Sequence, residues 1–415
     1  MSDRHDVLVV GGGPAGASCA YWLAEAGHDV LLVEKKRYPR EKTCGDGLTP
    51  RSVRQLHDMG LADELAAHHR FDGLRSIAFG RTLELQWPSH PDYPSYGYVV
   101  TRKDLDHLVA QRAEKAGATV WQQAAAESPL ADGPAVRGAV VRRPEGTAGV
   151  EASYVVVADG ANSRFGRALG TARNRSAPMG LAIRGYYESP RHDEPWIESH
   201  LDLRDKEGGA LPGYGWIFPV GDGRVNVGVG LLSTAKRWKS VNTSHLMEAF
   251  VAQAPASWDL RPETSCGPPT GGKLPMALSL SPTVGPSHLV IGDAGGAINP
   301  FNGEGICYAY ETGRMAAEAV SAALAGEAGA LEGYARRVQE EYALYYKVAS
   351  AFVRIIGHPQ AMRALVSTGM RSRTLMEWVL RIMANLLRPD ELGPAEAAYK
   401  AVAAVAARVP ARPAA

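Results

Sequence analysis

Three glycines near the start of the chain, Gly11, Gly13 and Gly16, have the G-x-G-x-x-G spacing that lets a backbone hold a diphosphate. The first glycine allows a tight turn, the second lets the backbone approach the diphosphate, and the third allows a helix to pack closely on a strand. The diphosphate then lies at a helix N-terminus, where free N–H groups and the helix dipole favour negative charge. Glu34 is placed to accept hydrogen bonds from an adenosine ribose. These residues predict a dinucleotide site.

The elements that must position these residues follow from the surrounding sequence. Residues 6–10 are mostly apolar and predict a strand, residues 17–26 have helical spacing, and residues 30–33 predict a second strand that ends at Glu34. The glycine motif alone is a weak signal, and a structural glycine-rich turn is its alternative interpretation. With both strands, the helix and the carboxylate in place, we expect a βαβ unit that binds a dinucleotide.

Two later segments repeat the pattern of a strand followed by Gly, Asp and small residues. Residues 154–170 read YVVVADGANSRFGRALG, and residues 288–306 read HLVIGDAGGAINPFNGEGI. Asp159 and Asp293 each end a predicted strand, where a carboxylate can bind ribityl hydroxyls, and the glycines that follow expose N–H groups. Either segment alone is also explained as a turn that any α/β fold requires. No second G-x-G-x-x-G is present, so the segments together favour FAD over NAD.

An aromatic run lies between these segments. Residues 180–232 alternate in polarity and predict strands of an antiparallel sheet, with a hairpin turn at residues 221–223. Tyr214, Trp216 and Phe218 are two residues apart, so in a strand they share a face. From the residues alone, a packing face is the better interpretation of this triplet, and a substrate wall is the alternative.

The composition excludes several classes of protein. The 415 residues carry a net charge of +1, which gives no reason to expect nucleic acid as a partner. The four cysteines have no CxxC spacing and no Asp, Glu or His cluster has metal-ligand spacing, so we expect neither disulfides nor a metal, in a reducing compartment. A strand within the first ten residues leaves no room for a signal peptide, and no run of about 18 apolar residues occurs. We therefore expect a cytoplasmic protein without a spanning segment.

The three segments in this order resemble the flavoproteins built like para-hydroxybenzoate hydroxylase, and within them the geranylgeranyl reductase family. The resemblance covers residues 5–330 and is carried by PREKTCGDGLTPRSV (39–53), VTRKDLDHLV (100–109), GYGWIFP (213–219) and GDAGGAINPFNGEGI (292–306). The CGDGLTPR form is similar to the actinobacterial members that saturate one isoprene unit of menaquinone. The FAD contacts implied by the resemblance are Ala15, Glu34, Cys44, Gly45, Gly47, Arg102, Asp293, Gly305 and Ile306.

The resemblance also implies a fold. We expect an α/β protein, α+β overall, with a Rossmann-like FAD-binding domain, an inserted antiparallel-sheet substrate domain and a C-terminal helical region. The expected boundaries are 1–75, 100–178 and 268–330 for the FAD-binding domain, 76–99 and 179–267 for the substrate domain, and 331–415 for the helical region. Asp293 would then take the ribityl chain, Gly303 to Ile306 would cover the isoalloxazine, and the aromatic strand would lie beside the substrate.

Four functions are compatible with these patterns. The first is reduction of a C=C bond in an isoprenoid chain, of menaquinone or of a geranylgeranyl lipid, with transient NAD(P)H, another reductant or an electron-donor protein as the source of electrons. The second is an FAD-dependent monooxygenase or epoxidase, although such enzymes usually carry His where Gly295 stands. A flavin halogenase is disfavoured because no lysine lies between Lys42 and Lys103. The fourth is a flavin-binding protein without turnover.

Reduction of an unactivated alkene needs a proton as well as a hydride, so we expect an acid beside the double bond. Cys44 lies in the glycine-rich TCGDG loop that the family places at the flavin. A thiol has an ordinary pKa of about 8.5 and is protonated at neutral pH. The alternative interpretation of Cys44 is a small buried residue.

The C-terminal residues predict helices and a contact with the membrane surface. Ser372–Arg388 has apolar residues, including Trp378, close to helical spacing and interleaved with arginines, which is typical of a helix in the membrane interface. A core helix with exposed arginines is equally consistent. We expect a peripheral position on the inner face of the cell membrane, and disorder in the Ala- and Pro-rich residues 403–415.

Overall fold

The computed structural model describes residues 4–204, 207–209, 213–234, 242–388, 390–391 and 393–408. The expected βαβ unit is confirmed: β1 (Arg4–Val10) and β2 (Val30–Glu34) are parallel and are joined by α1 (Pro14–Glu25). The helix begins three residues earlier than the spacing predicted because Pro14 occupies its first position, where the missing N–H needs no partner.

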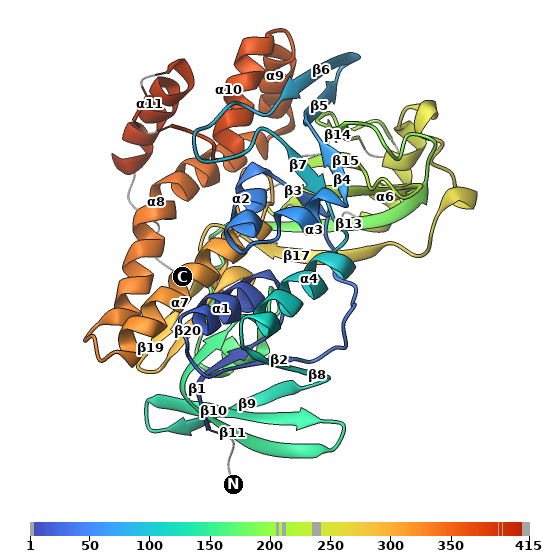
Figure 1. Cartoon of the computed structure of the whole chain (residues 1–415). Coiled ribbons are helices and arrows are strands. Elements are labelled where there is room, and N and C mark those ends of the chain that lie inside the picture. The colour runs from blue at the N-terminus through green and yellow to red at the C-terminus, as the bar shows by residue number, and fades with distance from the viewer. Residues whose placement is uncertain are drawn as a thin grey trace.

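This unit belongs to a sheet that has eight strands among the described residues, in the order β19-β20-β11-β1-β2-β8, with β9 and β10 continuing from β11 (Figure 1). The other members are β8 (Thr119–Gln122), β9 (Ala125–Asp132), β10 (Ala135–Arg143), β11 (Gly146–Val157), β19 (Val284–Gly285) and β20 (His288–Val290). Strands β8, β2, β1, β11 and β20 run parallel. The turns that follow β1, β11 and β20 therefore meet at one edge of the sheet.

Both faces of this sheet are buried. Along β1, Val7 and Val9 pack with the helices on one face, whereas Leu8 and Val10 pack with the β9–β10 side on the other. The helices that cover the first face are α1, α4 (Arg102–Lys115) and α7 (Ile306–Leu324). Three shorter helices are α2 (Pro50–Asp58), α3 (Ala62–Ala66) and α5 (Arg164–Ala168); α2 contacts α7, and α5 contacts β9.

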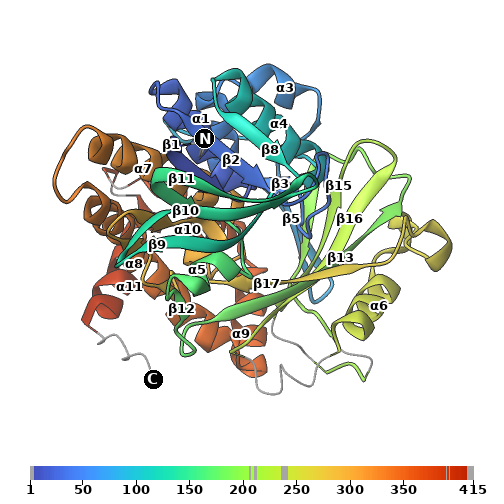
Figure 2. The ribbon, with the colours of Figure 1, turned by 90° about the horizontal axis from the view of Figure 1, so that it is seen from below.

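A second sheet, with seven strands among the described residues, stands beside the first in the order β17-β13-β16-β15-β14-β5-β6 (Figure 2). Its strands are β5 (Gly73–Ala78), β6 (Arg81–Gln86), β13 (Met179–Glu188), β14 (Trp196–His200), β15 (Gly213–Pro219), β16 (Arg224–Leu232) and β17 (Thr270–Pro275). All neighbours pair antiparallel except β14 and β5. Helix α6 (Thr243–Gln253) packs on the face away from the first sheet.

The α/β fold class with an additional, mostly antiparallel sheet is thus confirmed, and the predicted hairpin joins β15 to β16 through Gly221 and Gly223, which both have positive φ. The division into domains stays a prediction. Strands β5 and β17 both belong to the seven-stranded sheet and begin at Gly73 and Thr270. The expected boundaries place these two residues in the FAD-binding domain instead.

Small elements complete the part of the chain that the structure describes. β3 (Gly47–Leu48), β7 (Gly97–Val99) and β4 (His69–Phe71) form one sheet, and β12 (Ala172–Arg173) pairs with β18 (Leu280–Ser281). The 3-10 turns are η2 (Ala256–Trp258), η3 (Pro262–Thr264) and η4 (Gly292–Gly295).

The C-terminal helices are α8 (Ala330–Ile356), α9 (Pro359–Gly369), α10 (Arg373–Met383) and α11 (Pro394–Arg408). Helix α10 buries Met376 and Leu380 in a cluster with residues of β5, β6 and α9. Arg373 and Arg381 form ion pairs with Glu377 and Glu396. These contacts favour the packed alternative for this helix over a helix lying in the membrane interface.

The expected disorder from residue 403 onward is wrong for residues 403–408. These residues form the last turns of α11, because alanine has the highest helix propensity and Ala403 and Ala406 pack in the main core. Residues 409–415 lie outside the described residues. Within the described part of the chain, every helix is too short or too polar to cross a membrane.

The packing of α1 on β1 depends on Gly16. A Cβ added at Gly16 would lie 1.9 Å from the carbonyl oxygen of Gly11, and overpacking of this kind costs about 1–3 kcal/mol. Gly16→Ala should therefore lower the thermal unfolding midpoint. Gly333→Ala in α8, where an added Cβ meets only the Arg336 guanidinium at 3.7 Å, is the control and should be neutral or stabilising. A midpoint of Gly16→Ala equal to that of the wild type would contradict this account.

Candidate active site

A cavity of about 1310 Å³ lies between the edge of the eight-stranded sheet and the face of the seven-stranded sheet. Sites for one small ligand are usually about 300–1,000 Å³, so this cavity has room for more than one. The predicted site residues that line it are Gly11, Gly13, Ala15, Glu34, Cys44, Gly45, Arg102, Asp159, Tyr214, Trp216, Phe218, Asp293, Gly303, Gly305 and Ile306. Gly16 and Gly47 lie behind the lining, and their contact with a cofactor stays a prediction.

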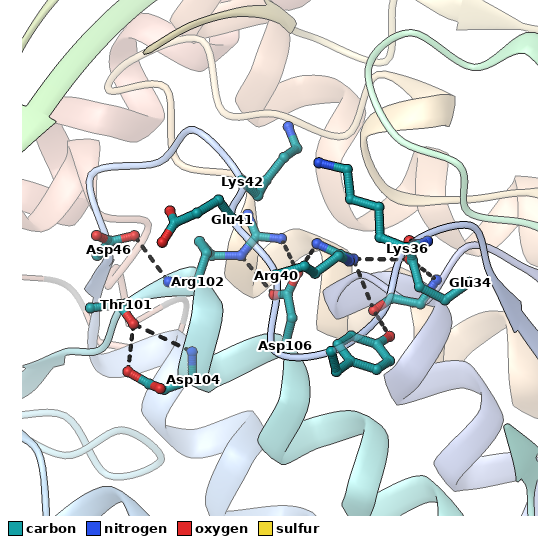
Figure 3. Close-up of polar contacts among 12 residues, drawn as sticks. Glu34, Lys36, Arg40, Glu41, Lys42, Asp46, Thr101, Arg102, Asp104 and Asp106 are labelled. Atoms are coloured by element: carbon teal, nitrogen blue, oxygen red, sulfur yellow. Dashed lines mark hydrogen bonds and ion pairs between the residues drawn. The ribbon is translucent and has the colours of Figure 1, made fainter. Parts of the chain in front are cut away.

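One end of the cavity carries a chain of alternating charges (Figure 3). The Glu34 carboxylate accepts hydrogen bonds at 3.0 Å from the Gly12 backbone N–H and from Arg40. Arg40 also donates to Asp106 at 2.8 Å, and Asp106 accepts two further bonds from Arg102 at 2.7 and 2.8 Å. All four charged side chains are nearly buried, and mutual pairing is what makes such burial tolerable. Glu34 and both arginines thereby hold fixed positions at the cavity wall.

Two helix N-termini open onto the same cavity. Helix α1 starts after Gly13 and α7 starts after Gly305, and neither has a side-chain cap or an acidic residue in its first turn. Their first N–H groups can therefore receive an anion or an electron-rich ring edge. A buried oxygen of Asp159, Oδ1, has no partner, while Oδ2 accepts from the backbone of α5. Uncapped N–H groups and an unpartnered carboxylate oxygen fit the diphosphate and hydroxyl groups of FAD.

The Cys44 loop lies against the aromatic strand β15. A Cβ on Gly45 or Gly47 would approach the Phe218 ring to 3.2 and 3.1 Å, so glycine lets the loop contact this ring closely. Tyr214, Trp216 and Phe218 line the cavity side by side, with ring centroids 5.8 and 6.3 Å apart. The prediction that the three rings share a face is confirmed. Their contact with substrate stays a prediction.

A buried network connects the Cys44 loop to the seven-stranded sheet. Asp46 is fully buried and has the left-handed φ of 64°. Its carboxylate accepts hydrogen bonds from Tyr186 Oη and from Asn226 Nδ2, the latter at 2.7 Å. Asn226 also donates to the Cys44 carbonyl at 2.9 Å and accepts from Trp216 Nε1 at 2.9 Å. The loop that carries Cys44 and the ring of Trp216 are therefore held by one amide side chain.

Burial sets the protonation of this region. Loss of solvent raises the pKa of Asp46 to about 6, although Tyr186 and Asn226 hydrogen bonds oppose the shift. Burial, followed by the negative charge of Asp46, raises the pKa of the Cys44 thiol above its usual range. Cys44 is only half-buried by exposed area because its side faces the cavity. At neutral pH the cavity wall thus holds a protonated thiol.

The cavity continues into an apolar limb formed by the C-terminal helices. Helices α8, α9 and α10 contribute its wall, through Phe352, Ile356, Met362, Leu365, Val366, Leu375, Met376, Val379 and Met383. Helix α10 is fixed beside the glycine loop because the Met383 carbonyl accepts from Asn299 at 3.0 Å and from Asn302 at 3.2 Å. Asn302 in turn accepts at its carbonyl from Tyr214 Oη at 2.8 Å.

Several of these residues were not predicted from the sequence. Asp46 stands inside the quoted CGDG motif, and an acid between two glycines was a usable signal for a structured turn. Asn226 is a lone amide in an apolar strand, which signals a buried polar partner. No pattern in the neighbouring sequence could predict that Asp46 would bond to Asn226 and Tyr186, which are distant in the chain. For the limb residues of α10 the sequence left a membrane contact and a core helix equally open, because spacing alone does not say what an apolar face covers.

Comparisons with known proteins agree with this geometry. Residues 4–206 match the FAD binding domain family. The chain is 41% identical over 391 residues to the menaquinone reductase of Mycolicibacterium smegmatis, covering 94% of each chain. It is 32% identical over 353 residues to digeranylgeranylglycerophospholipid reductase 1 of Methanopyrus kandleri, covering 82% of this chain and 87% of the relative.

Solved structures show the same fold. A geranylgeranyl bacteriochlorophyll reductase-like protein from Thermoplasma acidophilum superposes with a TM-score of 0.77 at 22% identity, covering 97% of this chain and 100% of that one. A flavin-dependent brominase superposes with a TM-score of 0.76 at 19% identity, covering 98% and 99%. The fold and the site define an FAD-dependent oxidoreductase. The chain belongs to the geranylgeranyl reductase family, which includes the menaquinone reductases.

Asp46 predicts a pH dependence of stability. The pKa of Asp46 is about 6 in the folded protein, and the pKa of an Asp in an unfolded chain is about 3.9. The folded protein therefore binds this proton more tightly, and its free energy of unfolding falls as the pH rises from about 4 to about 6. Asp46→Asn cannot ionise, so urea unfolding should show the wild type losing stability relative to this variant as pH rises through that window. Asp193→Asn, at an exposed position, is the control. A constant difference between wild type and Asp46→Asn across the window would contradict the raised pKa.

Asp293 gives a second prediction. We expect the Asp293 carboxylate to accept a hydrogen bond from a ribityl hydroxyl of FAD, and such a bond to a charged acceptor contributes about 1.5–3 kcal/mol. Asp293→Ala should therefore weaken FAD binding by roughly tenfold to a hundredfold. Titration of the FAD-free protein with FAD, followed by flavin fluorescence, measures the change. Asp193→Ala should retain the wild-type affinity. Equal affinities for Asp293→Ala and wild type would remove Asp293 from the cofactor site.

Proposed function

We propose that the protein saturates a C=C bond of an isoprenoid chain, carried by a menaquinone-type quinone or a geranylgeranyl lipid. The observation that carries the proposal is a single cavity that joins the glycine cradle at one end to the apolar limb at the other. Its limb is lined by apolar side chains and its middle by three aromatic rings, which suits an uncharged hydrocarbon. The names of the relatives, menaquinone reductase and digeranylgeranylglycerophospholipid reductase, support the same substrate class.

When bound, reduced FAD supplies a hydride. The residues of this chain do the rest: Glu34, the uncapped helices α1 and α7 and Asp293 hold the cofactor, and the limb of α8, α9 and α10 takes the isoprenoid. The hydroxyl of Tyr214 and the indole N–H of Trp216 are both engaged by protein acceptors, so these rings present apolar faces to the chain. The same wall excludes water from the double bond.

Cys44 is the proposed proton donor. The other alkene carbon must gain a proton, and the Cys44 Sγ holds one at neutral pH because burial and Asp46 raise its pKa. Asn226 fixes the Cys44 carbonyl and so the position of the thiol. The electrons for each turnover come from NAD(P)H, another small reductant or an electron-donor protein, and the enzyme meets its lipid at the membrane surface.

The reaction of the reduced enzyme with oxygen separates the proposal from its alternative. A reductase should be reoxidised faster by a prenyl quinone than by air, and a monooxygenase or epoxidase should be reoxidised rapidly by air with an oxygenated product. Anaerobic reduction followed by stopped-flow mixing with either oxidant measures both rates. Rapid reoxidation by air alone, with no response to prenyl lipids, would contradict the proposal.

Cys44→Ser and Cys44→Ala test the proton donor. Loss of a positioned acid typically lowers turnover by about 10²–10⁴-fold, and the serine variant should retain less activity than wild type because its hydroxyl is a weaker acid than a thiol. Turnover is measured in protein matched for FAD content. Full turnover in both variants would remove Cys44 from the mechanism.

Filling the apolar limb tests where the isoprenoid lies. Leu375→Trp enlarges a side chain of the limb and should lower kcat/KM for a long-chain substrate at least about tenfold, because a packed chain has little room to shift. Thr374→Trp, one residue away but exposed, adds the same ring outside the limb and should behave as wild type. FAD absorbance should be unchanged in both. Equal kcat/KM values for the two variants would place the isoprenoid elsewhere.

A further inference from the structure

A second, smaller cavity of about 340 Å³ lies at the surface near the apolar limb. Its lining includes Arg175 and Arg354, with His358, Ser233 and Thr234. The Thr234 hydroxyl donates to the Val353 carbonyl at 3.0 Å, whereas Ser233 Oγ accepts from the Met179 N–H at 2.9 Å and keeps its own O–H to donate. No Asp or Glu is among its lining residues in the described part of the chain. We call this the Arg175–Arg354 pocket. Two guanidinium groups and the Ser233 O–H are the donors of a phosphate site.

The two arginines of this pocket have no acidic partner among the residues that the structure describes. Within the residues that the structure describes, neither Arg175 nor Arg354 has an ion pair or a side-chain hydrogen bond. The arginines of α10 differ, because Arg373 and Arg381 are 2.9 and 3.2 Å from carboxylates. Burial lowers the pKa of Arg173, and the positive charge of Arg175 lowers it further, as expected where cations crowd without counter-ions.

The pocket shares its walls with the apolar limb. Near the start of β13, Pro178 lines the pocket and Gly180 lines the large cavity. At the end of β16, Ser233 lines the pocket and Leu232 lines the large cavity. On α8, Arg354 lines the pocket while Ile356 lines the limb. The ends of β13, β16 and α8 thus separate a cationic pocket from an apolar one, on the side of the molecule where α9 lies (Figure 2).

Exposed apolar residues lie on α8, which contributes to both cavities, and on α9, which contributes to the limb. Ile355, next to Arg354, is 53% exposed, and Leu365, on α9, is 47% exposed although it also lines the limb. Because Leu365 belongs to both the limb and the surface, the limb reaches the surface at α9. A surface that combines exposed aliphatic side chains with unpaired arginines matches the boundary of a bilayer, where acyl chains meet phosphate groups.

We infer that the Arg175–Arg354 pocket binds the phosphate of an anionic membrane phospholipid and so holds the opening of the apolar limb against the bilayer. This inference rests on the proposed function, because an isoprenoid substrate resides in the membrane. It places the membrane contact at the ends of β13, β16, α8 and α9 rather than on the arginines of α10. Ile355 and Leu365 enter the interface beside the bound head group, and the isoprenoid passes from the acyl region into the limb.

Sedimentation with vesicles tests the inference on the full-length, FAD-containing protein. The vesicles are phosphatidylglycerol or phosphatidylcholine, at low ionic strength and without substrate. A basic residue near an anionic surface contributes roughly fivefold to affinity, so Arg175→Glu/Arg354→Glu should weaken binding to phosphatidylglycerol at least tenfold. The matched control is Arg137→Glu/Arg336→Glu, which changes the net charge equally at exposed positions; Arg336 lies 18 residues, or about 27 Å of helix, from Arg354 on α8.

The expected result is strong binding of the wild type and the control to phosphatidylglycerol, weak binding of the pocket variant, and weak binding of all three to phosphatidylcholine. Equal binding of the pocket variant and the control would overturn the inference. A third outcome is a wild type that does not bind vesicles but is stabilised against thermal unfolding by inorganic phosphate, in a way that depends on Arg175 and Arg354. This outcome would assign the pocket to a free phosphate and overturn the inferred phospholipid site.

Vesicle binding and turnover are separate readouts. Failure of the wild type to reduce any detergent-dispersed prenyl quinone would refute the proposed function even if vesicle binding followed the expected pattern. Unaltered vesicle binding in the pocket variant would refute the head-group site even if the wild type reduced prenyl quinones. Unfolding midpoints and FAD content, which should match the wild type because both arginines are exposed, exclude misfolding as the cause of lost binding.

Discussion

The close packing of α1 against α7 is the contact on which the rest of the site depends. A Cβ added at Gly313 of α7 would lie 2.6 Å from the Ala15 carbonyl, so a glycine sets the separation of the two helices. The turn η4 approaches α1 as closely, because a Cβ added at Gly292 would lie 2.7 Å from the Ala15 Cβ. Ser18 Oγ donates to the Tyr310 carbonyl across the contact between α1 and α7, at 3.2 Å. The contact joins residues nearly 300 positions apart and brings two uncapped helix N-termini to one cavity.

From that contact the cavity extends in two directions with different chemistry. Toward β2 and α4, Glu34, Arg40, Asp106 and Arg102 alternate in charge, and each charge is stabilised by its neighbour. Toward the C-terminal helices the lining becomes aromatic and then aliphatic. The Cys44 loop stands between these regions, tied to the seven-stranded sheet through Asn226. The order of polar cradle, protonated thiol and apolar limb is the one that the proposed reduction of a water-insoluble chain requires.

The sequence predicted what is local and left open what depends on distant pairing. The βαβ unit follows from Gly11 to Glu34 because the turn, helix and strand are adjacent in the chain. The shared face of Tyr214, Trp216 and Phe218 also follows from local spacing, because the three rings stand at every second residue of β15. Asp46 and Asn226, 180 residues apart, meet only in the folded protein. Spacing in α10 predicted an amphipathic helix, but not that its apolar side would line a cavity. Alanine-rich residues 403–408 were mistaken for a disordered tail because low sequence complexity concealed their packing on α8.

The central claim is that one cavity brings the isoprenoid double bond against FAD and an acid of the protein. The most direct measurement is mass spectrometry of the prenyl quinone after a single anaerobic turnover by pre-reduced enzyme in heavy water. The account predicts a product with one saturated isoprene unit that has gained two deuterium atoms and no oxygen, in an amount equal to the FAD present. A prenyl chain recovered unchanged, or a product that forms only when oxygen is admitted and contains an oxygen atom, would contradict it.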